Sequence, residues 1–413
     1  MPSTARAYGP PVAHSHSHSH AHGDVDIDVP LRIRRLLTLL VVPVVLATGV
    51  GLLVLWPHGG GPNLNAVFDQ QSELVKGRVF DIRTTTCLGS PEGSTDRCQE
   101  AVVRVEEGRD KGKKVGLELG GSAGSPTVHR GDRLMLGTDR TGGKTQYYFS
   151  DFDRDLPITL LVVLFVVASI VFGRWSGVRA LAALVVSLLA IVWFVIPSVL
   201  HGHSPIAVAI VGSSLIMLAV LYVTGGFTTQ STVAVLGTML SLALIAALAW
   251  LFVTGSKLTG LADEDAVFLS AANGTINLQG LLLGGIVIGS LGVLDDMTVT
   301  QVSAVWELRR ANPAYDVRAL YRSAERIGRD HIASTINTLV LAYAGASLPL
   351  LIFFTQSNLQ LRHILTSEVI AVEVVRTLVG SIGLIASVPI TTAIAAYAVT
   401  RGAPRPRPDE VRT

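Results

Sequence analysis

Two adjacent carboxylates, Asp295 and Asp296, interrupt a long apolar segment of this chain. The apolar run ends at Leu294, and hydroxylic and amide side chains follow, among them Thr298 and Gln301. A carboxylate at the centre of a bilayer costs roughly 2.5–3.5 kcal/mol on insertion scales, and such residues usually mark an ion or proton path. The pattern predicts a polar strip on one helix. The alternative is a charged pair at the membrane boundary, where a charge costs little.

Other residues of the same segment extend this polar strip. Asn277 lies near its start, and Glu307 follows Asp296 by eleven residues, which is three helical turns and returns to the same face. The candidate pathway residues are therefore Asp295, Asp296, Thr298, Gln301, Glu307 and Asn277.

A glycine-rich face precedes the two carboxylates. Gly285, Gly289 and Gly292 are four and three residues apart, so they lie near one face of a helix. Small residues on one face let another helix approach closely. We expect these three glycines to be helix-packing residues, and the oligomeric state stays open.

The chain lacks the patterns that are typical of an enzyme. An intramembrane aspartyl protease needs two carboxylates that face each other and share a proton, whereas neighbouring residues on one helix point about 100° apart. The apolar segments also contain no GxSxG motif, phosphate-binding loop or nucleophile–base pair. We therefore expect no enzymatic activity.

Two further sets of side chains have ligand or redox chemistry. Cys87 and Cys98 flank a loop rich in Gly, Ser and Pro, and in an oxidising compartment they can form a disulfide; the alternative is two unpaired thiols. Alternating histidines near the N-terminus could bind divalent metal weakly, and the alternative is a solvated low-complexity tail. These histidines are His14, His16, His18, His20 and His22. No other cofactor is expected.

The composition predicts the elements that must position these residues. Of 413 residues, 49% are hydrophobic and only 15% are charged, compared with about 25% charged in soluble domains. The apolar residues form blocks long enough to cross a bilayer as helices. We expect an α-helical polytopic membrane protein of about eight transmembrane helices. The first is a retained anchor at 31–56; the other seven, within 157–400, are about 157–173, 179–199, 205–224, 232–254, 276–295, 331–354 and 375–399.

Three segments differ in composition from the apolar blocks. Residues 57–156 are polar and Gly-rich with five short β-prone runs, which predict a small all-β domain, either OB-like or another small barrel. Residues 1–30 form a disordered His-rich tail and residues 401–413 a second tail. The net charge of +2 is too small to indicate nucleic acid as a partner.

Arginines in the short connections predict the orientation in the membrane. Six lie between Arg309 and Arg329, whereas the opposite connections hold mainly the acidic run at 263–265. We expect a bacterial inner-membrane protein with both termini in the cytoplasm and residues 57–156 outside it. A short helix at 316–329 should lie on the inner surface, where Arg318, Arg322 and Arg326 meet anionic lipid. A docking site for a cytoplasmic partner is the alternative.

The order of these segments and one motif resemble the YibE/F-like family of bacterial membrane proteins. The motif runs from Gly284-Gly285-Ile286 through Leu294-Asp295-Asp296-Met297-Thr298 and continues to Glu307. The resemblance implies a span, a β-rich domain outside the cytoplasm and then a polytopic block, and it implies no established activity. We expect a transporter or channel-like permease for an ion or small solute. The alternative is an assembly or signalling factor whose outer β domain binds a protein partner.

Overall fold

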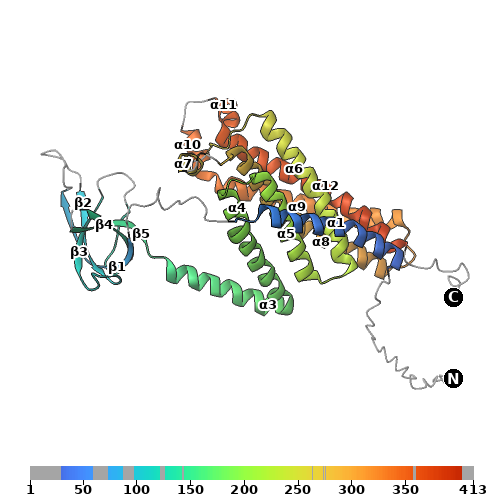
Figure 1. Cartoon of the computed structure of the whole chain (residues 1–413), viewed down its shortest axis with the longest axis horizontal. Coiled ribbons are helices and arrows are strands. Elements are labelled where there is room, and N and C mark those ends of the chain that lie inside the picture. The colour runs from blue at the N-terminus through green and yellow to red at the C-terminus, as the bar shows by residue number, and fades with distance from the viewer. Residues whose placement is uncertain are drawn as a thin grey trace, which may run out of the picture.

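The structure is a computed structural model that contains a five-stranded half-barrel and a bundle of long helices (Figure 1). It describes residues 29–58, 73–86, 97–120, 126–141, 144–262, 264–272, 274, 276–356 and 360–401. The predicted tail histidines from His14 to His22 and the cysteine Cys87 lie outside the described residues.

The half-barrel is antiparallel throughout. Its strands are β1 (Glu73–Thr86), β2 (Arg97–Val105), β3 (Lys114–Gly120), β4 (Arg133–Thr141) and β5 (Lys144–Phe152). They are hydrogen-bonded in the order β3-β2-β1-β4-β5, and the outer strands β3 and β5 also approach each other, as in a partly open OB-like barrel. Alternate residues point inward, so Ala101, Val103 and Val105 of β2 are all buried in the barrel core. The predicted small all-β fold is confirmed to the level of a half-barrel.

The helices account for the apolar blocks of the sequence. They are α1 (Leu31–Leu55), α3 (Asp155–Ala190), the π-helix η1 (Ile191–Val195), α4 (Ile196–Leu200), α5 (Pro205–Gly225), α6 (Thr229–Gly255), α7 (Glu264–Ala272), α8 (Leu278–Ala311), α9 (Val317–Ala346), α10 (Leu348–Thr355), α11 (Leu361–Thr366) and α12 (Glu368–Thr400). Among the described residues, six helical segments are long and apolar enough to cross a membrane, or seven if the bent pair α9–α10 is one span.

The helical segment Asp155–Leu200 contains a sharp break at Arg174. Arg174 has a non-helical backbone, with φ 50° and ψ −130°. A Cβ at Gly177 would overlap the carbonyl oxygen of Ser169, so the helix after the break folds back against the helix before it. A straight helix of 46 residues would be about 69 Å long at 1.5 Å per residue, more than twice a hydrocarbon core of about 30 Å.

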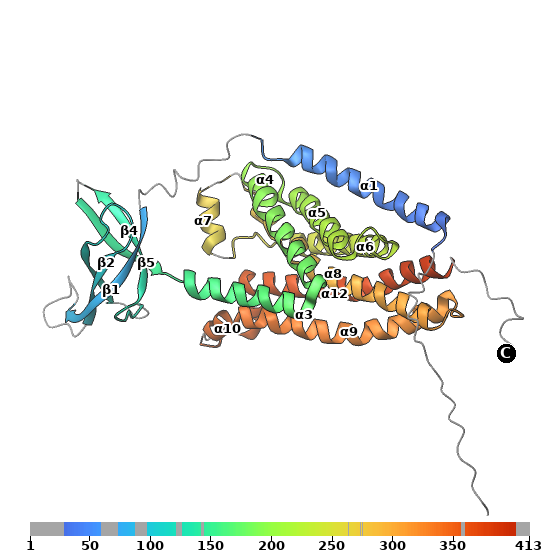
Figure 2. The same ribbon diagram turned by 90° about the horizontal axis from the view of Figure 1, so that it is seen from below.

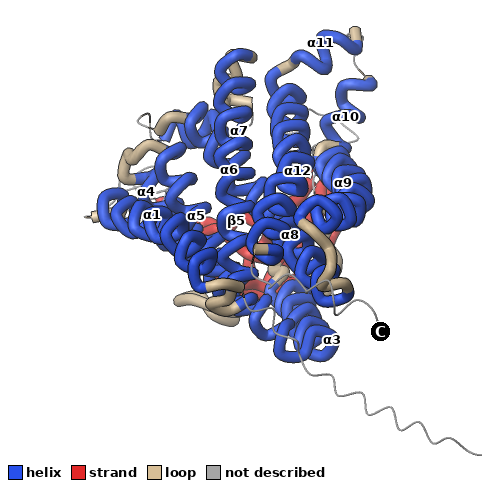
Figure 3. The backbone as a smooth tube through the Cα atoms, turned by 90° about the vertical axis from the view of Figure 1, so that its right-hand side faces the viewer, coloured by secondary structure: helices blue, strands red, loops and turns tan. Residues whose placement is uncertain are grey.

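Helices α6, α8 and α12 form the centre of the bundle, with α9 beside α8 and α12 (Figure 3). Close contact between α6 and α12 depends on glycine. A Cβ at Gly237 would overlap Thr391, and a Cβ at Gly383 would overlap Ile245. On the other side, α5 packs on α8, and α1 packs on α5 and α6 (Figure 2). The first half of α3 is different, because apolar side chains on all its faces are exposed, up to 88% at Phe172. Such a helix fits an apolar solvent.

The predicted separate helix on the inner surface, 316–329, is wrong. That segment is the start of α9, which continues unbroken to Ala346 before the chain bends by 64° into α10. Leu320, Ala324 and Gly328 are buried because this face packs against α8 and α12. The arginines Arg318, Arg322 and Arg326 are exposed on the remaining surface of α9.

Hydrogen bonds to the carboxylate of Glu368, the first residue of α12, connect this helix to the chain just before α7. Oε1 of Glu368 accepts hydrogen bonds from the backbone N–H of Thr259 at 2.6 Å, from its hydroxyl at 2.7 Å and from the N–H of Gly260 at 3.0 Å. We expect Glu368→Ala to lower the free energy of unfolding by about 1–2 kcal/mol, because hydrogen bonds to a charged group are stronger than neutral ones. Thermal unfolding in detergent measures this.

The matched control for this prediction is Glu325→Ala. Glu325 also makes a carboxylate contact, an exposed ion pair with Arg329 at 3.1 Å, and exposed pairs contribute less than about 1 kcal/mol. Equal losses of stability in the two variants would contradict a special role for Glu368.

Candidate functional site

Asp295 lines a cavity between α3, α5 and α8. The cavity has a volume of about 380 Å³ and is bounded mainly by aliphatic side chains, with Ser187, Thr224 and Asp295 as its polar members. Oδ1 of Asp295 is buried and has no hydrogen-bond partner among the described residues. Burying a polar atom without a partner is unfavourable. A carboxylate in this position is therefore available to an ion or proton that enters the cavity.

Asp296 points to a different side of α8. Its side chain is 75% exposed, and its Oδ2 lies 4.0 Å from Nε2 of His331 on α9. That nitrogen is buried and makes no hydrogen bond with a described residue. His331 was not among the predicted site residues, although an ionisable side chain at the start of a predicted span was a signal for it. The two adjacent aspartates thus occupy different environments, one in a cavity and one beside a histidine.

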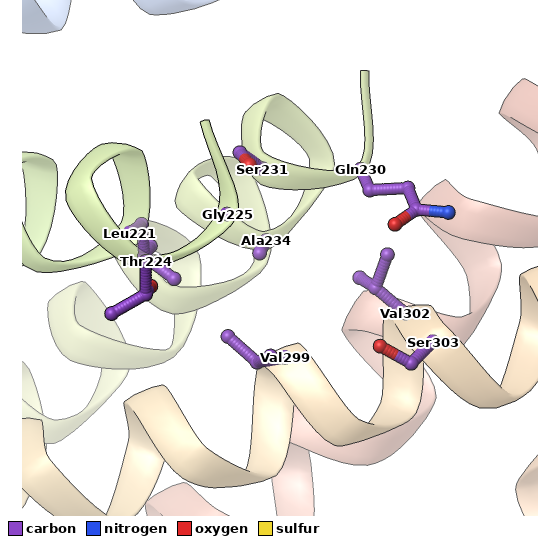
Figure 4. Close-up of a pocket in the computed structure, with 9 residues that line it drawn as sticks. All are labelled: Leu221, Thr224, Gly225, Gln230, Ser231, Ala234, Val299, Val302 and Ser303. Carbon is purple, nitrogen blue, oxygen red and sulfur yellow. The ribbon is translucent and has the colours of Figure 1, made fainter. Parts of the chain in front are cut away.

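Figure 4 shows a second, smaller cavity, which shares the lining residue Thr224 with the first one. It has a volume of about 130 Å³ and lies between the end of α5, the start of α6 and the second half of α8. Gln230 and Ser303 reach toward this space in Figure 4. Thr224 lines both cavities. A polar side chain therefore lies between the cavity of Asp295 and the end of the bundle where α5 connects to α6.

Thr298 and Gln301 connect helices and do not line the cavity of Asp295. The hydroxyl of Thr298 lies 2.7 Å from that of Thr238 on α6. Nε2 of Gln301 donates to the carbonyl of Ala324 on α9 at 2.8 Å and to the hydroxyl of Thr392 on α12 at 2.7 Å. Both side chains are buried. Their geometry fits interhelical packing, in which polar residues hold helices together.

The two ends of the predicted polar strip are apart from the cavity. Asn277 is the N-cap of α8, and its Oδ1 accepts from the N–H of Gly280 at 3.0 Å. Glu307 is exposed and pairs with Arg310 at 2.7 Å on the last turns of α8. Neither residue lines the cavity of Asp295. Of the six predicted pathway residues, only Asp295 therefore lines this cavity.

The predicted packing role of Gly285, Gly289 and Gly292 is wrong within a single chain. All three are exposed, and a Cβ at each would meet no atom of a described residue within 4 Å. The close approach occurs one residue earlier, at Gly284, where a Cβ would lie 3.0 Å from Cβ of Ala209 and 3.2 Å from the carbonyl oxygen of Pro205. The buried face of α8 is therefore adjacent to the face that the spacing indicated.

Two other predicted features are described only in part. Cys98 is buried in β2 and disulfide-bonded, while Cys87 lies outside the described residues, so the pairing of these two cysteines stays a prediction. The same holds for weak metal binding by the histidine tail.

The comparisons with known proteins point to one family. A family model described as YibE/F-like protein matches residues 161–401, which is more than half of the chain and includes α5, α6, α8, α9 and α12. No curated protein and no solved structure matches the chain.

Proposed function

The chain belongs to the YibE/F-like family, and from this premise we propose that it is a bacterial membrane permease that moves an ion or small solute past Asp295. The observation that supports transport is the position of Asp295. An unpartnered carboxylate oxygen lies beside a cavity between helices, and ionisable groups within a membrane domain usually belong to an ion or proton path.

The proposed path has two parts. The cavity of Asp295 supplies a binding position within the bundle, and Thr224 connects it to the smaller cavity near Gln230 and Ser303. Asp296 and His331 form a second ionisable pair beside the first position. Two such positions allow an ion or proton to enter one site and leave from another.

The proposed topology has eight transmembrane helices. Dividing Asp155–Leu200 at Arg174 adds one span to the six long helices, and counting α9 with α10 adds another. This topology places the protein in the inner membrane, with both termini in the cytoplasm and the half-barrel outside it. The positions of the arginine-rich segments agree with this orientation. Arg318, Arg322 and Arg326 would meet anionic lipid from the cytoplasmic side, and a weak divalent metal site in the histidine tail remains part of the proposal.

Flux through proteoliposomes tests the proposal. We expect the purified chain to carry protons, a monovalent cation or a divalent metal faster than empty liposomes, with internal pH and metal dyes as readouts. The alternative is an assembly or signalling factor that acts through a protein partner of the outer β domain. A correctly folded protein with no flux for any of these ions would favour that alternative.

A further inference from the structure

A row of four basic residues crosses the outer surface of the half-barrel. The strand register places Lys114 of β3 opposite Arg104 of β2, Arg104 opposite Arg78 of β1, and Arg78 opposite Arg133 of β4. Residues that lie opposite one another share a face of the sheet, and all four are exposed. Like charges directly opposite each other destabilise a sheet, so an anion bound at the row would offset this repulsion.

Most of this charge has no ion-pair partner among the described residues. Arg78 pairs with Glu106 at 2.9 Å, whereas Arg104, Lys114 and Arg133 make no ion pair with a described residue. Several acidic residues of the half-barrel and of the start of α3 already have other partners. Asp151 pairs with Arg154, Asp153 and Asp155 pair with Lys76, and Asp110 pairs with Lys113.

Three cationic side chains lie close to one exposed aromatic ring. Phe80 lies at an irregularity in the pairing of β1 with β2, between Val79 and Asp81, and is 40% exposed. Lys114 Nζ is 4.2 Å from the ring centroid, and the guanidinium carbons of Arg104 and Arg130 are 5.2 and 5.6 Å from it. A bulge of this kind redirects a side chain and is common beside binding sites.

The row lies where the half-barrel joins the first apolar helix after it. The N–H of Asp153 donates to the carbonyl of Arg133 at 2.9 Å, and Lys76 of β1 binds Asp155, the first residue of α3. This contact raises the pKa of Lys76. The apolar surface of α3 starts at Leu156. Asp153 is three residues before Leu156, which is about 10 Å of extended chain, so the Arg133 end of the row lies about one Debye length of 8–10 Å from the expected lipid boundary. The other members of the row follow at about 4.8 Å per strand.

We propose that the row formed by Arg78, Arg104, Lys114 and Arg133, together with Phe80 and Arg130, binds anionic phospholipid headgroups of the membrane that α3 enters. Phosphate groups supply the negative charge that the row lacks, and the guanidinium groups bind them with paired donors. The position next to α3 selects membrane lipid over a soluble anionic polymer. Binding would hold the half-barrel against the membrane surface.

Full-length protein in nanodiscs of phosphatidylcholine with increasing phosphatidylglycerol tests this proposal. Hydrogen exchange in the turns at 106–113 and 126–132, which flank the row, should slow as the anionic lipid increases. Each basic residue near an anionic surface contributes about 1 kcal/mol, or about fivefold in affinity. We therefore expect Arg104→Gln to raise the half-effective fraction of phosphatidylglycerol about fivefold and Arg104→Gln with Lys114→Gln to raise it further.

The controls separate binding from folding and from general charge. Arg104→Lys keeps the charge and loses only the paired donors, so it should shift the half-effective fraction less than Arg104→Gln. Arg83→Gln removes one exposed charge of β1 outside the row and should shift nothing. Exchange that does not respond to phosphatidylglycerol, or an equal shift in Arg83→Gln, would overturn the proposal. If soluble polyphosphate slows hydrogen exchange in these turns in pure phosphatidylcholine and phosphatidylglycerol does not, the row binds a soluble anionic polymer and the lipid proposal is overturned.

Discussion

Reconstituted Asp295→Asn protein is expected to lose ion flux by at least about tenfold and to be no less stable than the unchanged protein. Asparagine has nearly the same shape as aspartate, but it cannot take up and release a proton, and it lacks the negative charge that attracts a cation. The carboxylate has a buried oxygen without a hydrogen-bond partner in the described part of the chain, so its removal takes away an unfavourable charge. Insertion scales place the cost of such a charge at roughly 2.5–3.5 kcal/mol. Residues that lower stability in this way are typical of functional sites.

Proteoliposome flux and thermal unfolding together measure this result. The matched control is Glu307→Gln, which removes an exposed carboxylate from the same helix, away from the cavity, and should leave flux within about twofold. Asp296→Asn tests the second ionisable position and should reduce flux less than Asp295→Asn, because its side chain is mostly exposed. Unchanged flux in Asp295→Asn with a normal fold would contradict transport past Asp295.

The sequence predicted the elements where a single signal was strong. Five short β-prone runs in a Gly-rich segment predicted the strands of the half-barrel, one of which contains the buried Ala101, Val103 and Val105. Hydropathy located the long helices, but it divided Val317–Ala346 into a surface helix and a separate span. The arginines of the first half caused that division, while the buried Leu320, Ala324 and Gly328 show that tertiary contacts continue along the helix.

Parts of the candidate site required the three-dimensional arrangement. The type and position of Asp295 made it a candidate, but the cavity beside it depends on how α3 and α5 pack on α8. Glycine spacing showed that Gly285 and Gly289 share a face without showing which face of the helix is buried. The basic row from Lys114 to Arg133 depends on strand register, because its members are far apart in sequence.

Gly383→Val is expected to lower the free energy of unfolding by about 1–3 kcal/mol, the usual cost of adding volume to a packed core. A Cβ at Gly383 would overlap the side chain of Ile245 on α6, so α6 and α12 must separate to make room. These two helices form the centre of the bundle with α8. Separation would also disturb the hydrogen bond between Thr392 and Gln301. Thermal unfolding in detergent measures the loss.

Gly289→Val is the matched control, because the same side chain enters open space on an exposed face of α8. We expect its stability to stay within about 0.5 kcal/mol, as for most surface substitutions. Combining Gly383→Val with Ile245→Ala should cost less than the sum of the single changes, because residues in contact are not additive. Equal losses in Gly383→Val and Gly289→Val would contradict the proposed contact between α6 and α12. They would indicate instead that the glycine face of α8 is buried against a second copy of the chain.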